Sequence, residues 1–343
     1  MAVPWCGATS TIPLVSQTTF IKYLRSLNYA AFSCSSALPS FSPQTIPPKS
    51  LKALGGSSVQ GMMNSEDLVI SCRIGKGSYG EVWRGVVRGR GAARAVDVAA
   101  KVVPLDGSDI SAVQHEVELQ REAGKHPSIV GLLGCFHHDE AAWLLLELCA
   151  TSVSDALHRR GAQLEEPMIA AVCAGALRGL HWLHASCRIV HRDIKCANLL
   201  LSAGGEVQIA DFGIASRLSD TSDAAGGLSC SPGQPATPRA GTVIGSPLWM
   251  APEMIADGLC DTPVDVWSLG ICALEMAEMQ PPHAEMQPLT SMYRIANGPA
   301  PSLRAAAAWS NPFHAFVGSC LRKVLVYDSN LSPNPNPAPN PDY

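Results

Sequence analysis

The sequence lacks the features that would place it in a membrane, in a disulfide-rich class or among nucleic-acid binders. No apolar run approaches the ~20 residues of a membrane-spanning helix, and the most apolar helix candidate, Val264 to Met276, contains Asp265, Ser268 and Glu275. The 12 cysteines include no close-spaced pair, so reduced, mostly buried thiols in an intracellular protein are expected. A net charge of −4 over 343 residues shows no bias toward nucleic acid. These absences leave a globular chain, long enough for one large domain or two modest ones.

Acidic side chains are also missing from residues 1–65. This stretch is rich in Ser and Thr and places Phe20, Leu24, Leu27 and Ala31 at helical spacing. Such a start is typical of an organelle transit peptide, which would involve residues 1–40. The alternative is a disordered extension of a cytoplasmic protein. At the other end, a Pro/Asn-rich tail at residues 328–343 cannot form regular structure and is assigned no function.

Two short apolar segments in the middle of the chain each lead into a polar cluster. Ile189–Val190 precedes Asp193 and Asn198, and Val207–Ile209 precedes Asp211. Carboxylate and amide oxygens ligate hard ions such as Mg²⁺, and a carboxylate kept off the metal can accept a hydroxyl proton. The pattern therefore predicts a loop site that holds metal and phosphate beside a base.

A glycine-rich segment and a strand lysine precede this site. Gly75, Gly77 and Gly80 lie between two β-type segments, where backbone amides can approach phosphates closely. A dinucleotide-binding glycine motif would continue directly into a helix, but here a strand begins at Val82. The next strand carries Lys101 among apolar neighbours, where a lysine is costly unless it is paired. Both features favour a nucleotide lid with a lysine that grips phosphates.

In combination these motifs resemble the protein kinase family. Asp193 ends a His-Arg-Asp triplet, Asp211 begins Asp-Phe-Gly, and Glu253 ends Ala-Pro-Glu. Lys195, two residues after Asp193, resembles the serine/threonine kinases rather than the tyrosine kinases. Finer details resemble the sterile-20 group near its Hippo-type branch; they are Ser152–Asp155, Thr242–Gly245, Trp249–Glu253 and Pro281–Ala284. The similarity covers about residues 68–323.

The resemblance implies a two-lobed α+β fold at about residues 66–327. A small β-rich N-lobe is expected at about 66–148 and a larger helical C-lobe at about 149–327. Strands are expected near residues 68–70, 82–87, 96–103, 129–135 and 143–148, and helices near 108–123, 168–185, 264–276 and 310–323. The family's last helix and its Pro-x-x-Arg-Pro segment do not follow, so the C-lobe is expected to be truncated. Arg304 and Arg322 are candidates to replace the missing arginine beside Glu253.

The resemblance also assigns roles in an ATP-dependent, Mg²⁺-dependent protein serine/threonine kinase. Lys101 would hold phosphates and pair with Glu116, Asp193 would be the base, and Lys195 would neutralise the transferring phosphoryl. Asn198 and Asp211 would ligate Mg²⁺, and Asp265 would brace the catalytic loop. ATP is expected to contact Ile74, Gly75, Gly77, Gly80, Val82, Ala99, Lys101, Leu146, Glu147, Cys149 and Leu200. Substituting Lys101 with Met is expected to stop transfer and to leave the fold largely intact.

Some alternatives stay open on sequence alone. Glu118 and Glu122 compete with Glu116 for Lys101, and Gln120 stands where kinases of this type usually place an apolar residue. A catalytically impaired scaffold with the same fold is the alternative function. No coiled coil of the kind through which Hippo-type kinases dimerise follows the domain, so dimerisation is left open.

The segment between Asp211 and Glu253 is interpreted as an activation loop. It contains a Ser/Gly/Pro-rich insertion without periodicity. By resemblance to Hippo-type kinases, Thr242 is expected to be the activating phosphosite. Arg192, next to Asp193, would bind its phosphate through charge-assisted hydrogen bonds.

Overall fold

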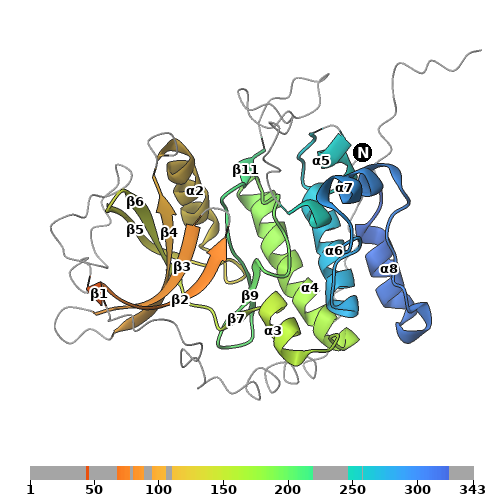
Figure 1. Cartoon of the computed structure of the whole chain (residues 1–343), viewed down its shortest axis with the longest axis horizontal. Coiled ribbons are helices and arrows are strands. Elements are labelled where there is room, and N and C mark those ends of the chain that lie inside the picture. The colour runs from red at the N-terminus through yellow and green to blue at the C-terminus, as the bar shows by residue number, and fades with distance from the viewer. Residues whose placement is uncertain are drawn as a thin grey trace, which may run out of the picture.

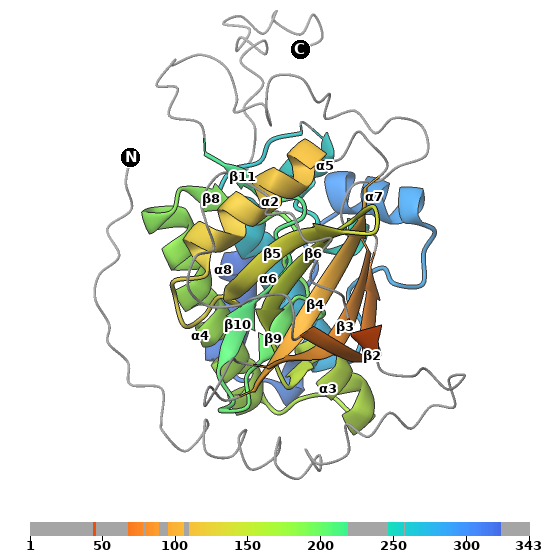
Figure 2. The same ribbon diagram turned by 90° about the vertical axis from the view of Figure 1, so that its left-hand side faces the viewer.

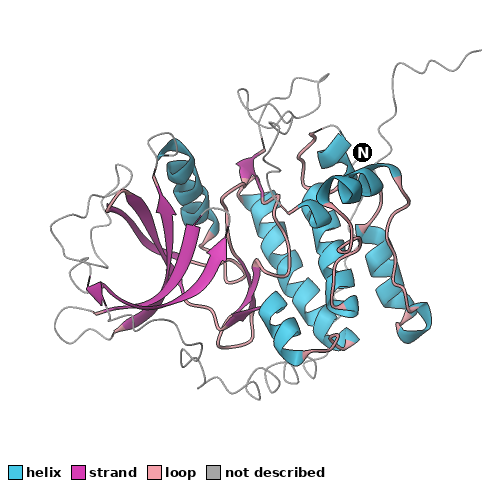
Figure 3. Ribbon diagram, viewed as in Figure 1, coloured by secondary structure: helices cyan, strands magenta, loops and turns pink. Residues whose placement is uncertain are grey.

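A computed structural model describes residues 44–45, 68–77, 80–88, 95–105, 110–218, 246–256 and 258–323. They form two lobes that follow one another along the chain (Figure 1), a strand-rich lobe first and a helix-rich lobe second. Figure 3 shows the same division by secondary structure. The two-lobed α+β fold predicted from the sequence is therefore confirmed.

The first lobe is built on an antiparallel sheet with the strand order β1-β2-β3-β4-β6-β5. Its strands are β1 (Gln44–Thr45), β2 (Leu68–Gly77), β3 (Gly80–Val87), β4 (Val96–Pro104), β5 (Leu132–His138) and β6 (Ala141–Glu147). Successive strand residues point to opposite faces, so Val98 and Ala100 pack in one apolar cluster and Val103 in another. Lys101 consequently shares the face of Val103.

Helix α2 (Ile110–Ala123) covers that second face, as Figure 2 shows. Val113 and Val117 of the helix pack with Val103 and Leu144 of the sheet. The sequence predicted a helix over residues 108–123, and its first two residues lie outside the described part of the chain. Because Lys101 points to the same face, the helix brings a glutamate within its reach.

The strand predicted at residues 129–135 begins three residues later, at Leu132. Ile129 and Val130 lie instead against the second lobe, where Ile129 forms a parallel bridge with Ile209. The Val130 amide donates to the Ile209 carbonyl at 3.0 Å, and the Ile209 amide donates to the Ser128 carbonyl at 2.8 Å. The apolar pattern was correctly interpreted as β-type. Its first residue, Ile129, however, pairs with Ile209 of the other lobe, and local sequence does not encode that partner.

The second lobe packs its helices around α6. Its elements are β7 (Thr151–Ser152), α3 (Val153–Arg160), α4 (Glu166–His181), β8 (Ile189–Val190), β9 (Leu199–Leu201), β10 (Val207–Ile209), β11 (Ser216–Arg217), α5 (Pro252–Ala256), α6 (Pro263–Glu278), α7 (Pro288–Asn297) and α8 (Asn311–Cys320). Only three of the 16 residues of α6 escape burial, as expected for a helix that is apolar on all sides. The central core helix predicted near Val264–Met276 is confirmed.

Two further observations concern the described residues only. None of their helices is long and apolar enough to cross a membrane. All nine cysteines in this part are free thiols, and burial raises the pKa of Cys149 to about 12 and that of Cys320 to about 11. Free and mostly buried thiols agree with the sequence expectation.

Candidate active site

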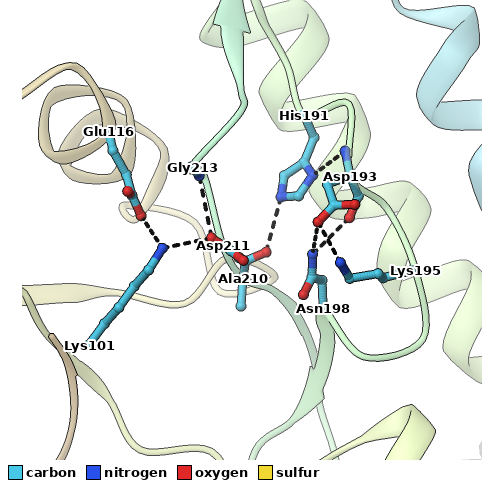
Figure 4. Close-up of polar contacts among 9 residues, drawn as sticks. All are labelled: Lys101, Glu116, His191, Asp193, Lys195, Asn198, Ala210, Asp211 and Gly213. Carbon is cyan, nitrogen blue, oxygen red and sulfur yellow. Dashed lines mark hydrogen bonds and ion pairs between the residues drawn. The ribbon is translucent and has the colours of Figure 1, made fainter. Parts of the chain in front are cut away.

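The candidate site lies where the two lobes meet, and Figure 4 shows its polar contacts. The first lobe contributes Lys101 from β4 and Glu116 from α2. The second lobe contributes the loop between β8 and β9, which carries Asp193 and Asn198. Asp211 follows two residues after the end of β10. Short strands thus hold each polar cluster at the boundary, as the sequence pattern predicted.

Lys101 connects the lobes through two carboxylates. Its Nζ lies 2.6 Å from Glu116 Oε1 and 2.8 Å from Asp211 Oδ1. Burial by itself lowers the pKa of Lys101, but the negative charges of Asp211 and Glu116 outweigh it and raise that pKa above its usual value. Among the three glutamates left open by the sequence, Glu116 is the one that contacts Lys101. Glu118 is exposed, and Glu122 pairs with Arg217 at 2.6 Å.

Asp193 is held so that one carboxylate oxygen is hydrogen-bonded and the other is not. Its Oδ2 accepts from Lys195 Nζ at 2.7 Å and from Asn198 Nδ2 at 2.9 Å. Its Oδ1 is buried and has no hydrogen-bond partner among the described residues. Buried acceptors are normally satisfied, so an unpaired carboxylate oxygen sets Asp193 apart from the other buried acids of this site. Lys195 Nζ also donates to Ser246 Oγ at 2.7 Å, a contact that the sequence analysis missed.

Asn198 and Asp211 offer the oxygens that a hard cation needs. Asn198 Nδ2 donates to the Asp193 backbone carbonyl at 2.8 Å and also to its Oδ2, which turns the amide oxygen away from Asp193. Asp211 uses Oδ1 for Lys101 and, at 3.4 Å, for the Gly213 amide. Burial alone raises the pKa of Asp211, but the charge of Lys101 outweighs it and holds that pKa low. An ionised carboxylate and an amide oxygen fit a divalent metal such as Mg²⁺.

The backbone is strained at two residues of this site. Arg192 has φ of 67° and Asp211 has φ of 69°. Non-glycine residues in the left-handed region are uncommon, and they cluster at functional sites, where surrounding contacts hold them in place. Here the Arg192 amide donates to Asp265 Oδ1 at 2.7 Å and its Nε donates to the Ile214 carbonyl. The unusual backbone of Arg192, next to Asp193, is therefore held by hydrogen bonds from both its main chain and its side chain.

Asp265 of α6 accepts hydrogen bonds from the backbone of the loop that carries Asp193. It is fully buried, and its Oδ2 accepts from the His191 amide at 2.8 Å. His184 Nε2 lies 2.8 Å from the same oxygen. Burial alone raises the pKa of Asp265, but the hydrogen bond from His184 and its charge hold that pKa below its usual value. The predicted bracing contact is present, and His184 is a partner that sequence reasoning missed.

The residues expected to contact the nucleotide lie on adjacent strands and on β9. Cross-strand pairing places Val82 opposite Lys101 and Ala99 opposite Leu146, while Gly75 faces Val82 from the other side. Leu200 lies half-buried in β9. The first lobe contributes Ile74, Gly75 and Gly77 from β2, Gly80 and Val82 from β3, Ala99 and Lys101 from β4, and Leu146 and Glu147 from β6; Cys149 follows two residues after β6.

Gly80 has a structural reason to be glycine. Its φ is 144°, and a Cβ there would lie 2.1 Å from the Val102 carbonyl oxygen. The close approach to β4 excludes any side chain whether or not phosphate is bound.

Side-chain hydrogen bonds connect the end of β6 and the segment after it to the second lobe. The Cys149 thiol donates to Gln208 Oε1 at 3.2 Å, and Gln208 Nε2 donates to Glu147 Oε2 at 3.4 Å. The Glu147 amide donates to the Gly131 carbonyl at 3.0 Å. Gln208 was not singled out from the sequence, since one polar residue in the middle of a three-residue strand carries no local signal.

Two expectations near Glu253 have different outcomes. Arg304 does not replace the missing arginine, because its Nε pairs with Glu278 Oε2 at 3.2 Å. Glu253 acts on Lys323: burial lowers the pKa of Lys323, and the negative charge of Glu253 partly offsets this effect. Thr242 lies outside the described residues, so its predicted role rests on the sequence alone.

A two-lobed fold with a lysine–glutamate pair in one lobe and the Asp193, Asn198 and Asp211 side chains facing it from the other is typical of the protein kinase class. Residues 68–325 match the protein kinase domain. The chain therefore belongs to the protein kinase family, which binds ATP with a divalent metal ion. This confirms the family that the motifs predicted.

The chain is similar to two serine/threonine kinases. It is 38% identical over 253 residues to "Serine/threonine-protein kinase 1" of Arabidopsis thaliana, covering 73% of this chain and 28% of that protein. It is 36% identical over 252 residues to "Serine/threonine-protein kinase cst-1" of Caenorhabditis elegans, covering 73% of this chain and 46% of that protein. The chain thus spans less than half the length of these relatives.

Proposed function

We propose that this chain is an ATP-dependent protein serine/threonine kinase (EC 2.7.11.-) of the sterile-20 group. It would transfer the γ-phosphoryl of Mg-ATP to serine or threonine hydroxyls of proteins in a signalling cascade. The observation that carries the proposal is the unpaired Oδ1 of Asp193, whose other oxygen is held by Lys195 and Asn198. A scaffold that only binds would have no need for a buried, unsatisfied carboxylate oxygen beside a lysine. We place this activity in the cytoplasm; the organelle alternative depends on residues 1–40, which lie outside the described part.

The residues of the chain would act mainly by positioning and electrostatics. Lys101 would hold the α- and β-phosphates, with Glu116 fixing the direction of its ammonium. Asn198 and Asp211 would hold Mg²⁺, which when bound neutralises phosphate charge. Asp193 Oδ1 would accept the proton of the attacking hydroxyl, and Lys195 would offset negative charge on the transferring group.

Asp193→Asn tests the assignment of the base. The amide keeps the shape of the side chain but is a far weaker proton acceptor, so kcat is expected to fall by roughly 10²–10⁴-fold. The KM for ATP should stay near the wild-type value, because Asp193 would hold neither nucleotide nor metal. Steady-state rates on a generic basic protein give kcat and the KM for ATP. Phosphoamino-acid analysis of the product identifies the residues that are phosphorylated. The exposed Asp97→Asn is the matched control; an Asp193→Asn enzyme as fast as this control would remove the base from Asp193.

Phosphorylation of Thr242 is expected to raise activity several-fold. A phosphate adds a charge of about −1.5 to −2 and three acceptor oxygens, which can bind a guanidinium and order the loop. Arg192 is half-buried beside Asp193, and its Nε is already bonded to the Ile214 carbonyl, so its remaining N–H groups would face the phosphate. Activity before and after incubation with ATP should rise in wild type but not in Thr242→Ala.

Arg192→Ala should lose this gain even when residue 242 is phosphorylated, as mass spectrometry can verify. Ser229→Ala removes a rival serine in the same loop and should behave as wild type. A Thr242→Ala protein as active as phosphorylated wild type contradicts the assignment.

A further inference from the structure

Gln120 is a buried polar residue on the helix that carries Glu116. Its side chain lies one turn after Glu116, on the same side of α2, and the residue is 2% exposed. Its neighbours Val117 and Leu119 are buried apolar residues. A buried amide is costly unless it is hydrogen-bonded, so the partner of Gln120 indicates what the residue does.

That partner is the Val130 carbonyl oxygen, to which Gln120 Nε2 donates a short hydrogen bond. The segment around Val130 is anchored to the second lobe. The Val130 amide donates to the Ile209 carbonyl, and the Ile209 amide donates to the Ser128 carbonyl. A Cβ at Gly179 of α4 would lie 3.0 Å from the Ser128 oxygen, so this segment packs closely against α4 as well.

The packing between α2 and this segment is also close at the end of the helix. A Cβ at Gly124 would lie 3.3 Å from Gly131 Cα. Two other contacts connect α2 to the second lobe. In the first, Trp182 Nε1 donates to the Ala123 carbonyl at 3.0 Å. The Glu122–Arg217 ion pair is largely exposed and therefore weak. The hydrogen bond of Gln120 differs from both of these contacts, because Gln120 is buried and lies one turn from Glu116, which pairs with Lys101.

A continuous set of contacts therefore joins the two carboxylates that hold Lys101. It starts at Glu116, passes along one helical turn to Gln120, crosses to Val130 and reaches Ile209, two residues before Asp211. We propose that Gln120 is a positioning residue: its hydrogen bond to Val130 sets the rotation of α2 relative to β10 and so keeps Glu116 and Asp211 on Lys101 together. This inference rests on the proposed kinase function for its catalytic consequence, but its structural part does not.

Gln120→Met removes the donor, keeps a side chain of similar length, and leaves the buried Val130 carbonyl without this partner. Since the Trp182 contact remains, the helix should turn rather than detach. Gln120→Glu has the same shape as glutamine but places an acceptor opposite the carbonyl. If Gln120 only fills space, Gln120→Met should disturb the position of α2 less than Gln120→Glu does. If the hydrogen bond to Val130 matters, both variants should disturb it.

The structural arm measures amide hydrogen exchange in the full chain. In Gln120→Met, exchange at residues 113–123 is expected to be roughly tenfold faster, with residues 264–277 of α6 unchanged. The control is Gln114→Met, the same substitution at an exposed position of the same helix, which should exchange as wild type. Unchanged exchange in Gln120→Met overturns the proposal, and equally faster exchange in α6 indicates general destabilisation and overturns it too.

The catalytic arm measures both KM values and kcat. Misplaced Glu116 should raise the KM for ATP roughly tenfold and leave the KM for the protein acceptor unchanged, whereas a smaller folded fraction would lower only the apparent kcat. A wild-type chain without transferase activity, but with faster α2 exchange in Gln120→Met, refutes the proposed function and keeps the structural inference. An active enzyme whose ATP KM is the same in Gln120→Met and Gln114→Met refutes the positioning role.

Discussion

Replacing Lys101 with methionine is expected to abolish phosphoryl transfer and also to destabilise the fold. The ammonium lies between the buried carboxylate of Glu116 at 2.6 Å and the partly buried carboxylate of Asp211 at 2.8 Å. Without it, like charges remain in a poorly solvated place, and breaking such a buried pair costs about 3–5 kcal/mol. The sequence alone suggested that the fold would be left largely intact, because a lysine serving phosphates need not hold the core. The structure adds a second role for the same charge.

A double substitution separates the two roles of Lys101. Glu116→Gln in the Lys101→Met background removes one of the stranded charges and should return part of the lost stability. It should not return activity, since the phosphate-binding cation is still missing. Urea unfolding and transfer rates measured on the four proteins of the cycle give both answers. A Lys101→Met protein as stable as wild type would show that Lys101 does not stabilise these carboxylates. A transfer rate near that of wild type would show that Lys101 does not bind the phosphates.

The second large effect is expected for Asp265→Asn. The carboxylate accepts from the amides of His191 and Arg192 and lies 2.8 Å from His184 Nε2. An asparagine has only one acceptor oxygen, so at least one buried amide donor must face its NH₂ group. Loss of a buried, multiply bonded charge costs about 3–5 kcal/mol. Because the loop that it braces carries Asp193, kcat should fall along with the free energy of unfolding.

The effect of Asp265 on stability should depend on pH in one direction. Its pKa is lowered in the folded protein, so its contribution is present above the unfolded pKa of about 3.9 and is lost as pH falls through the folded pKa. The gap in unfolding free energy between wild type and Asp265→Asn should therefore be full at pH 7 and shrink below about pH 4. The exposed Asp97→Asn should change stability by less than about 0.5 kcal/mol. A gap that is absent at pH 7, or that widens in acid, contradicts the bracing role.

Much of this site could be predicted because its residues lie in short, rigid motifs. Asp193 and Asn198 are five residues apart in one loop, so their proximity follows from local geometry. The alternation of strand residues also put Lys101 on one face of its sheet. The choice of Glu116 over Glu118 was open on sequence alone and became clear only from how α2 lies on that face.

What the sequence missed are contacts between segments far apart in the chain. His184 lies 81 residues from Asp265, Ser246 lies 51 residues from Lys195, and Gln208 lies 59 residues from Cys149. None of these side chains has a pattern that reports its partner, because tertiary packing alone brings them together. Gln120 was visible as a departure from an apolar position, but its partner Val130 could not be read from the sequence. The strand start at Leu132 was missed for the same reason.

The measurement that tests the account most directly is transfer of labelled γ-phosphate by the full chain, compared with Asp211→Asn. With Mg-ATP and a generic basic protein, wild type is expected to incorporate phosphate into serine and threonine. Asp211→Asn loses the proposed metal-binding charge and the partner of Lys101, so it should incorporate at least about 10²-fold less. Circular dichroism of both proteins verifies that they are folded. Incorporation by Asp211→Asn equal to that of wild type, or none by a folded wild type, would contradict the assignment of this site as a kinase active site.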